Sequence, residues 1–317
     1  MPIRKNTQAK HNASKADAHN TIYEMVTMRI LNEMSNGKIP WRDIIINKKG
    51  QKPAYTNFVT GKPYSFLNCL LLGEPGEFAS FKQIKERGGV IKKGAKGRFV
   101  IFWGEFVPKE NKEKVEELEK EGKDASHLKV KFPKYYTVFN INDTEGVRRA
   151  DPEEMQEEKT MEEAEAPTAT ARMVREYYEY SQQVRVLEDT SSVGTYLPDT
   201  DEVAVQPKEN FEFEEDWFAS VFSGLVHSTA TEERCNRENE LKKMREGETS
   251  VKEELIGEIG SSMILTACGL QRKETHEQLA ATCQKWIEQF KNDYRLIVTS
   301  SYAAEKAAKL ILGEFAA

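Results

Sequence analysis

The sequence has few of the residues that build disulfide frameworks and thiolate metal sites. Its 317 residues include four cysteines, and no two of them form a CxxC pair. These are Cys69, Cys235, Cys268 and Cys283. Free thiols in a reducing compartment account for them, so neither a disulfide scaffold nor a cysteine-based zinc site is indicated.

Long apolar runs are also missing. No stretch approaches the ~20 apolar residues that a membrane-spanning helix needs, and residues 1–18 lack the apolar core of a secretory signal. We therefore expect a cytoplasmic protein with no membrane partner. Hydrophobic residues make up 38% and charged residues 31%, which is polar but typical of a folded chain.

The charge is unevenly distributed along the chain. Residues 1–147 carry an excess of nine positive charges and residues 148–317 an excess of fifteen negative charges, within a net charge of −6. This asymmetry predicts that the first half binds a polyanion. An acidic stretch with Ala, Pro and Thr divides the halves, as a linker does. The predicted parts are a mobile tail at 1–18, a first domain at 19–147, a linker at 148–170 and a second domain at 171–317.

The hydrophobic pattern predicts secondary structure in both domains. In the first, apolar residues at helical spacing follow His19, and β-prone runs at 99–103 and 135–140 flank a charged insertion at 109–129. In the second, short strands are expected at 184–187 and 202–206. Helices are expected at about 171–181, 213–229, 249–268, 275–292 and 300–313.

Residues 81–98 form a basic segment in the first domain. The segment holds seven Lys or Arg residues against one acid, Glu86, and it contains four glycines. Lysines neutralise nucleic-acid phosphates and release counterions, and glycines allow the backbone to approach a ligand closely. The segment therefore predicts phosphate binding. The alternative is a lysine-rich hairpin on a solvated face.

Aromatic residues surround this segment. They are Trp41, Tyr55, Phe58, Tyr64, Phe66, Phe81, Phe102, Trp103, Tyr135 and Tyr136. Most of them are needed for the core of a domain of this size. Trp41, Tyr55, Phe58 and Tyr64 lie beside turn residues, so we expect these four to be partly exposed and to stack on unpaired bases.

Five short motifs in the first domain occur in a recognisable order. They are Ile39-Pro-Trp41, Asn57-x-x-Thr60-Gly61-Lys62-x-Tyr64-x-x-x-Asn68-x-Leu70-Leu-Leu72, Ser80-Phe81-Lys82-Gln83, Gly89-Val-x-Lys92-Lys93-Gly94-x-Lys96-Gly97 and Val138-Phe139-Asn140. Together, over about residues 20–147, they resemble the N-terminal domain of ArdC-type antirestriction proteins, which plasmids, phages and conjugative elements carry. The resemblance implies that this domain binds single-stranded DNA.

The resemblance extends past the linker to a zincin-like metallopeptidase domain. The residues that carry it are Tyr196, Asp201-Glu-Val203, Pro207, Phe211 or Phe213, Leu225-Val226-His227-Ser228-Thr229 and Glu253-Glu254-Leu255-x-x-Glu258-Ile259. It implies an α+β fold class, with an N-terminal α/β DNA-binding domain followed by a mainly helical zincin-like domain that has a small sheet.

The zinc-binding motif of that family is degenerate in this chain. In the motif His-Glu-x-x-His, two histidines on one helical face bind zinc and the Glu activates a water. The aligned residues here are Ser223-Gly224-Leu225-Val226-His227, and the other candidate, His276-Glu277, has Ala280 where the second His would stand.

We therefore predict a pseudo-metallopeptidase with no catalytic residue and no cofactor, zinc included. Three vestigial ligand candidates remain: His227, Glu254 and Glu258. We expect His227 to be hydrogen-bonded to Glu254 or Glu258. The alternative is weak metal binding by His227 with both acids.

The predicted function is single-stranded DNA binding in a mobile genetic element, with an antirestriction or DNA-protection role. The predicted DNA contacts are Trp41, Arg42, Tyr55, Asn57, Phe58, Lys62, Tyr64, Asn68, Lys82, Lys85, Arg87, Lys92, Lys93, Lys96 and Arg98. Two alternatives remain open: an atypical zinc metallopeptidase acting on a host defence protein, and a protein-interaction scaffold whose acidic half binds a host or element-encoded partner.

Overall fold

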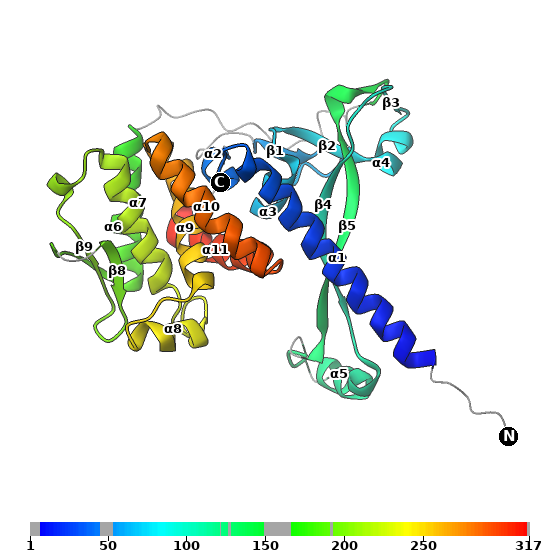
Figure 1. Cartoon of the computed structure of the whole chain (residues 1–317). Coiled ribbons are helices and arrows are strands. Elements are labelled where there is room, and N and C mark those ends of the chain that lie inside the picture. The colour runs from blue at the N-terminus through cyan, green and yellow to red at the C-terminus, as the bar shows by residue number, and fades with distance from the viewer. Residues whose placement is uncertain are drawn as a thin grey trace.

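A computed structural model describes residues 7–44, 53–120, 122–125, 128–148, 166–190 and 193–315 (Figure 1). The N-terminal part mixes helices with short and long strands. Its helices are α1 (Thr7–Ser35), α2 (Pro40–Asp43), α3 (Phe66–Leu72), α4 (Phe81–Glu86) and α5 (Lys112–Lys120). Its strands are β1 (Tyr55–Asn57), β2 (Gly76–Ser80), β3 (Val90–Ile91), β4 (Arg98–Phe106), β5 (Val130–Asn140) and β6 (Thr144–Glu145).

A long antiparallel hairpin, β4–β5, dominates the N-terminal part. The four-stranded sheet has the order β1-β2-β5-β4, so β4 lies at its edge. Strand pairing runs from Arg98↔Val138 to Phe106↔Val130. In Figure 1 the hairpin extends well beyond the rest of the sheet, with α4 and β3 near one end and α5 at the other. The two predicted β runs therefore lie in β4 and β5, and α5 lies in the predicted charged insertion.

The C-terminal part is mainly helical around a small sheet. Its helices are α6 (Pro167–Gln182), α7 (Glu214–Ser228), α8 (Glu238–Arg245), α9 (Val251–Cys268), α10 (His276–Asn292) and α11 (Leu296–Leu312). Its sheet has the order β7-β9-β8, formed by β7 (Arg185–Glu188), β9 (Glu202–Val205) and β8 (Val193–Leu197). The predicted α+β fold class is confirmed. Helix α8 and strand β8 were not predicted from the sequence.

Helix α9 is the centre of the C-terminal part and is buried on nearly all sides. Two glycines on α9 face α7. A Cβ at Gly257 would lie 2.7 Å from the His227 ring, and one at Gly260 would lie 2.8 Å from a Val226 methyl group. Glycine costs a helix interior about 1 kcal/mol relative to Ala. Here it allows α7 and α9 to pack closely.

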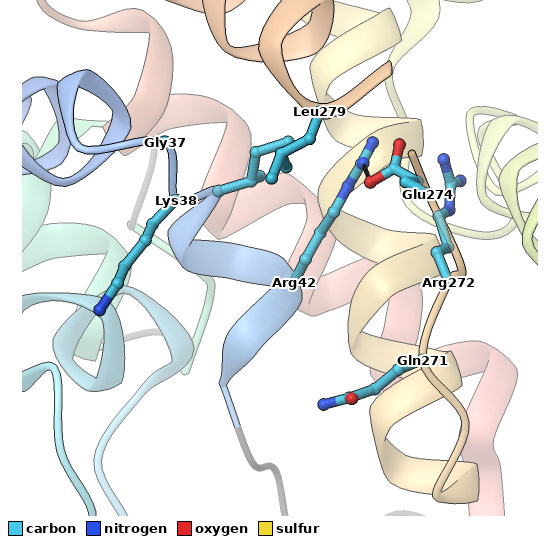
Figure 2. Close-up of a pocket in the computed structure, with 8 residues that line it drawn as sticks. Gly37, Lys38, Arg42, Gln271, Arg272, Glu274 and Leu279 are labelled. Carbon is cyan, nitrogen blue, oxygen red and sulfur yellow. Dashed lines mark hydrogen bonds and ion pairs between the residues drawn. The ribbon is translucent and has the colours of Figure 1, made fainter. Parts of the chain in front are cut away.

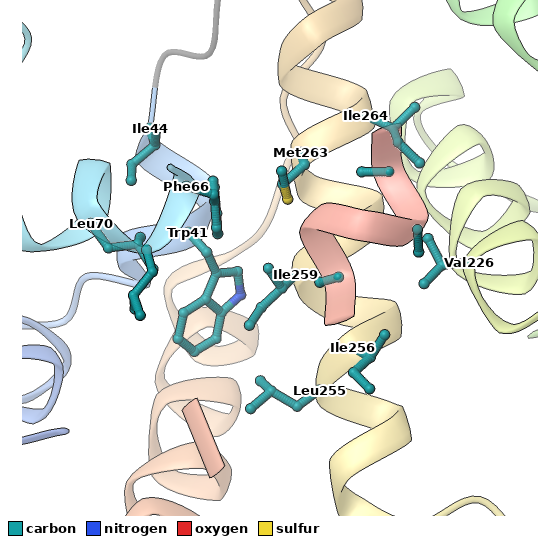
Figure 3. Packing of buried hydrophobic residues seen from close by; sticks show 14 of the residues in the cluster. Trp41, Ile44, Phe66, Leu70, Val226, Leu255, Ile256, Ile259, Met263 and Ile264 are labelled. Atoms are coloured by element: carbon teal, nitrogen blue, oxygen red, sulfur yellow. The ribbon is translucent and has the colours of Figure 1, made fainter. Parts of the chain in front are cut away.

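The two parts of the chain share one buried apolar cluster. It extends from Ile22 of α1 to Leu312 of α11. Helix α2 packs on α9, α1 on α10, and α3 on α11. Figure 3 shows the Trp41 side chain of α2 among apolar residues of α3 and α9. The C-terminal helices thus hold the N-terminal helices in place.

Two boundary predictions can be compared with the structure. Helix α1 begins at Thr7 rather than at His19, so residues 7–18 of the predicted tail are helical. Residues 149–165 of the predicted linker lie outside the described residues. In the part of the chain that is described, no helix is long and apolar enough to span a membrane.

Candidate nucleic-acid interface and metallopeptidase-like site

The basic segment, residues 81–98, forms α4, β3 and the turns that join them to β4. Ser80 caps α4: its hydroxyl accepts a hydrogen bond from Gln83 N at 3.3 Å, and Gln83 Oε1 accepts one from Ser80 N at 2.9 Å. Gly88 and Gly94, at φ of 78° and 90°, form turns that other residues rarely adopt. The predicted Ser cap and glycine end of this helix are confirmed.

The lysines of this segment are at the surface. Lys82, Lys85, Lys92, Lys93 and Lys96 are all exposed. Their recorded contacts are weak: Lys82 lies 3.7 Å from Glu86, Lys85 Nζ lies 5.1 Å from the Phe81 ring centroid, and Lys92 Nζ donates to Asn142 O at 2.9 Å. Exposed ion pairs contribute little to stability, so these ammonium groups remain available to an anion.

Three further cationic side chains that were predicted to contact DNA differ in their surroundings. Lys62 is exposed on the turn after β1, and Arg87 is half-buried. Arg98 donates from Nη1 to Leu72 O at 2.6 Å and pairs through Nη2 with Glu74 at 2.6 Å. Arg98 therefore joins β4 to the end of α3, and these pairings give it a structural role that does not support its predicted DNA contact.

Trp41 and Arg42 face the protein interior. Trp41 is 0% exposed, and its ring packs edge-on against Trp286 at 6.5 Å and Phe290 at 6.1 Å. Its Nε1 donates to Glu258 Oε1 at 3.2 Å. Arg42 donates from Nε to the same oxygen at 2.7 Å and also pairs with Glu274. The expectation that Trp41 is partly exposed was wrong, because α2 inserts Trp41 and Arg42 between α9 and α10. This placement does not support their predicted DNA contacts.

A small polar pocket lies beside Arg42. It has a volume of about 190 Å³ and is lined by Lys38, Arg42, Arg272 and Glu274, among others. Figure 2 shows Arg42 directed at Glu274, with Arg272 beside them. Arg42 and Arg272 are both paired with Glu258, so the two guanidinium groups of this pocket are already neutralised, while Lys38 is exposed.

Tyr55, Tyr64 and Asn68 are buried as well, so the expectation that Tyr55 and Tyr64 are partly exposed was wrong. Burial does not support the predicted DNA contacts of these three residues. The Asn68 amide acts as a strand partner for the edge strand β4. Its Nδ2 donates to Ile101 O at 2.8 Å, and its Oδ1 accepts from Ile101 N at 2.7 Å. Buried backbone groups of an edge strand need such partners.

Asn57 organises the turn after β1. Its Oδ1 accepts from Val59 N at 3.1 Å and from Thr60 N at 3.0 Å. This is the local bonding that favours Asn in turns, so a structural role accounts for Asn57, and its predicted DNA contact is not supported. Phe58 is half-buried, as expected for a residue beside a turn.

Among the described residues of the N-terminal part, the exposed aromatic side chains lie elsewhere, on α4 and on the β4–β5 hairpin. Exposure is 53% for Phe81, 47% for Phe102, 40% for Trp103, 51% for Tyr135 and 48% for Tyr136. These residues are absent from the predicted contacts. The strand runs 99–103 and 135–140 lack the alternation of apolar and polar residues that would mark one face as exposed to solvent. The signal in the sequence that could have indicated a DNA contact was the position of these aromatic residues close to the basic segment.

In the C-terminal part, α7 carries residues 223–227 and places them against α9 and the sheet. Ser223 Oγ and His227 Nε2 converge on Gly257, where an added Cβ would lie 2.9 Å and 2.7 Å from them. On the sheet side, a Cβ at Gly224 would lie 2.3 Å from a Val203 methyl group. The position of the expected general base therefore has no room for a side chain.

His227 has a different partner from the two predicted. Its Nδ1 lies 3.0 Å from Glu253 Oε1, so the expectation of Glu254 or Glu258 as its partner was wrong. Glu253 is fully buried and also receives two bonds from Arg237, from Nε at 2.8 Å and from Nη2 at 2.6 Å. Buried carboxylates require such paired partners.

The other two acids lie on the opposite side of α9. Glu254 pairs with Lys285 of α10. Glu258 accepts from Trp41 and Arg42, and its Oε2 lies 3.4 Å from Arg272 Nη1. Neither carboxylate contacts His227, so the three vestigial ligand candidates do not come together.

Both buried carboxylates are held in the ionised form. Burial raises the pKa of Glu253, but hydrogen bonds from His227 and Arg237 outweigh burial and leave the pKa below its ordinary value. Burial likewise raises the pKa of Glu258, and the charges of Arg272 and Arg42 then lower it below its ordinary value. Because Glu253 is a carboxylate, His227 Nδ1 carries the proton and donates it. Carboxyls of such low pKa are poor general bases near neutral pH.

This arrangement does not fit the metal of a zincin. A neutral Ser hydroxyl replaces one histidine, a glycine replaces the general base, and the remaining His227 packs against α9. The cation nearest the buried Glu253 carboxylate is the Arg237 guanidinium. Within the described ranges, no three His, Cys, Asp or Glu residues form a group that could hold a metal ion.

The fold and site define a class of protein: a basic α/β domain with a protruding hairpin, joined to a metallopeptidase-like helical domain. Comparison with known families agrees. Residues 20–139 match the N-terminal domain of the anti-restriction factor ArdC, and residues 177–304 match the zincin-like metallopeptidase family.

Similar proteins extend the match to nearly the whole chain. The metal-free crystal structure of the antirestriction ArdC protein from the R388 plasmid is 25% identical, covers 93% of this chain and 97% of its own, and has a TM-score of 0.60. Its Mn(II)-bound structure, also 25% identical, covers 93% and 98% with a TM-score of 0.61. This chain therefore has the ArdC-type architecture.

A curated relative is longer than this chain. DNA primase TraC of Escherichia coli is 25% identical over 314 residues, which are 94% of this chain. The chain spans about a quarter of that relative, 27% of its length.

Proposed function

We propose that this protein binds single-stranded DNA of a mobile genetic element and serves an antirestriction or DNA-protection role. One observation carries the binding proposal: five lysines of the basic segment are exposed, two on α4 and three on the turn between β3 and β4. Lysines in this arrangement bind phosphates without base specificity. The ArdC-type architecture and the plasmid origin of the similar structure support the biological role.

Competition among nucleic acids tests the ligand class. A labelled single-stranded oligonucleotide bound to the full chain is challenged with unlabelled single-stranded DNA, duplex DNA and RNA of the same sequence. We expect single-stranded DNA to displace the label at a lower concentration than duplex DNA, because exposed aromatic residues beside the lysines contact only unpaired bases. Equal displacement by duplex DNA would contradict the assignment.

We further propose that the metallopeptidase-like domain is a non-catalytic scaffold. The support is geometric: the positions of the metal ligands and general base are occupied by Ser223, Gly224 and a His227 that donates to Glu253. The same domain holds α2, since Glu258 of α9 binds Trp41 and Arg42. In this proposal the domain serves to hold the N-terminal helices.

Metal analysis tests the scaffold proposal. After expression in medium containing zinc and manganese, we expect well under one bound metal ion per chain by elemental analysis. We also expect no change in melting temperature on adding EDTA, because Arg237 already neutralises Glu253. One tightly bound metal ion per chain, with a loss of stability in EDTA, would instead favour the atypical metallopeptidase.

A further inference from the structure

The β4–β5 hairpin carries a surface of aromatic side chains that are not part of the buried core. Paired residues of an antiparallel ladder share a face. On one face, Phe102 is opposite Lys134, Gly104 opposite Phe132, and Phe106 opposite Val130. Tyr136 lies on the same face, opposite Val100. We call Phe102, Phe106, Phe132 and Tyr136 the aromatic stripe.

The rings of the stripe are in contact along the hairpin. Phe102 and Tyr136 lie edge-on with centroids 5.6 Å apart, and Phe106 and Phe132 with centroids 5.7 Å apart. Phe132 leans over Gly104, where an added Cβ would lie 2.9 Å from its ring. Phe102, Phe106 and Tyr136 are nevertheless exposed to solvent. Exposed aromatic area of this extent is typical of a binding surface.

The opposite face of the hairpin also exposes aromatic rings. Trp103 and Tyr135 lie on neighbouring pairs of that face, Trp103↔Pro133 and Ile101↔Tyr135. Both rings are exposed. Rings on both faces leave the projecting hairpin with stacking surfaces on two sides.

Positive charges lie beside the stripe. Lys134 Nζ lies 5.0 Å from the Phe132 ring centroid. Lys92, Lys93 and Lys96 immediately precede β4 in the sequence, and α4 and β3 lie near one end of the hairpin (Figure 1). Aromatic rings next to a cationic groove are the combination that binds single-stranded nucleic acid, with bases on the rings and phosphates on the lysines.

We propose that unpaired DNA bases stack on the aromatic stripe and on Trp103, while the lysines of residues 82–96 bind the phosphates. This inference rests on the proposed function and adds to it the surface that contacts the bases. It replaces Trp41, Tyr55 and Tyr64, which are buried, with aromatic residues that solvent and ligand can reach. A duplex keeps its bases inside and cannot use this surface.

The test compares two oligonucleotides that carry the same phosphates. One is oligo(dT), and the other is an abasic strand of equal length. We expect the full chain to bind oligo(dT) at least about fivefold more tightly than the abasic strand, which is the lower end for stacking of one base. The double variant Phe102→Ala/Tyr136→Ala should abolish most of that difference while retaining affinity for the abasic strand.

A matched control substitutes exposed tyrosines far from the hairpin. The Tyr180→Ala/Tyr302→Ala variant removes two exposed rings from the C-terminal helices α6 and α11 and should bind both strands like the wild type.

Intrinsic tryptophan fluorescence gives a second readout, which needs no substitution that destabilises the fold. Trp103 is the exposed one of the four tryptophans, since Trp41, Trp217 and Trp286 are buried. Oligo(dT) should therefore quench the solvent-accessible emission, and a Trp103→Phe variant should not show that quenching.

The outcomes separate this inference from the proposed function. If the wild type binds oligo(dT) and the abasic strand equally and Trp103 is not quenched, the stacking surface is wrong while phosphate binding by the lysines stands. If the wild type binds neither strand at low salt, both proposals fail.

Discussion

Replacing Lys92, Lys93 and Lys96 with Glu should abolish DNA binding and leave the fold intact. Each substitution turns an attraction for phosphate into a repulsion, so we expect affinity for single-stranded DNA to fall at least about 100-fold at low salt. All three side chains are exposed, and surface substitutions usually change stability by no more than ~0.5 kcal/mol. Fluorescence anisotropy measures the affinity, and circular dichroism reports the fold.

The neutral triple variant, with Gln at the same positions, adds a quantitative check. The dependence of log K on log salt should become shallower by about 2, since each phosphate contact on a single strand contributes about 0.7. A control with Gln at Lys242, Lys252 and Lys291, which are exposed in the C-terminal part, should leave both affinity and slope unchanged. Wild-type affinity in the Glu variant at low salt would remove the basic segment from the site.

Substituting Trp41 with Ala should strongly destabilise the protein without acting on the DNA site. Trp41 is fully buried against Trp286 and Phe290 and donates to Glu258. Truncating a buried Trp to Ala typically costs about 3–5 kcal/mol of unfolding free energy. Denaturant unfolding followed by circular dichroism measures this loss.

Trp103→Ala is the matched control for this substitution. Because Trp103 is exposed, its loss should cost less than ~1 kcal/mol and should reduce affinity for unpaired DNA instead. The milder Trp41→Phe variant should remain folded and bind DNA within about twofold of the wild type, since the ring is far from solvent. A stable Trp41→Ala protein that has lost DNA binding would restore Trp41 to the interface and refute its role in packing.

Local sequence signals predicted much of the fold. The Ser80 cap, the β-prone runs of β4 and β5, and five long C-terminal helices were all recognisable within short windows, because capping, strand propensity and helical periodicity are local properties. The resemblance to ArdC-type proteins supplied the order of the domains. The exposure of the lysines also followed from the sequence, since lysine is rarely buried.

The errors arose where partners lie far apart in the sequence. Trp41 stands next to a proline, as a turn residue does, yet its hydrogen-bond partner Glu258 lies 217 residues away. Asn68 sits in a short apolar helix, and nothing local indicates that its amide bonds to Ile101. Such long-range contacts are properties of the tertiary fold.

The partner of His227 illustrates a related limit. Glu254 and Glu258 share a helical face, which favoured them as a pair. Helix α9 is buried on nearly all sides, however, so its apolar pattern does not show which face meets α7. The structure shows that the face carrying Glu253 and Gly257 does so.

Equilibrium binding of the wild-type full chain across a salt series tests the central claim most directly. Labelled oligo(dT) and a duplex of the same length are each titrated from low to physiological salt. Five phosphate-binding lysines predict tight binding of the single strand, weakening with a log–log slope of about −3 to −4, and weaker binding of the duplex. A single strand that does not bind at the lowest salt, or that binds with no dependence on salt, would contradict the account.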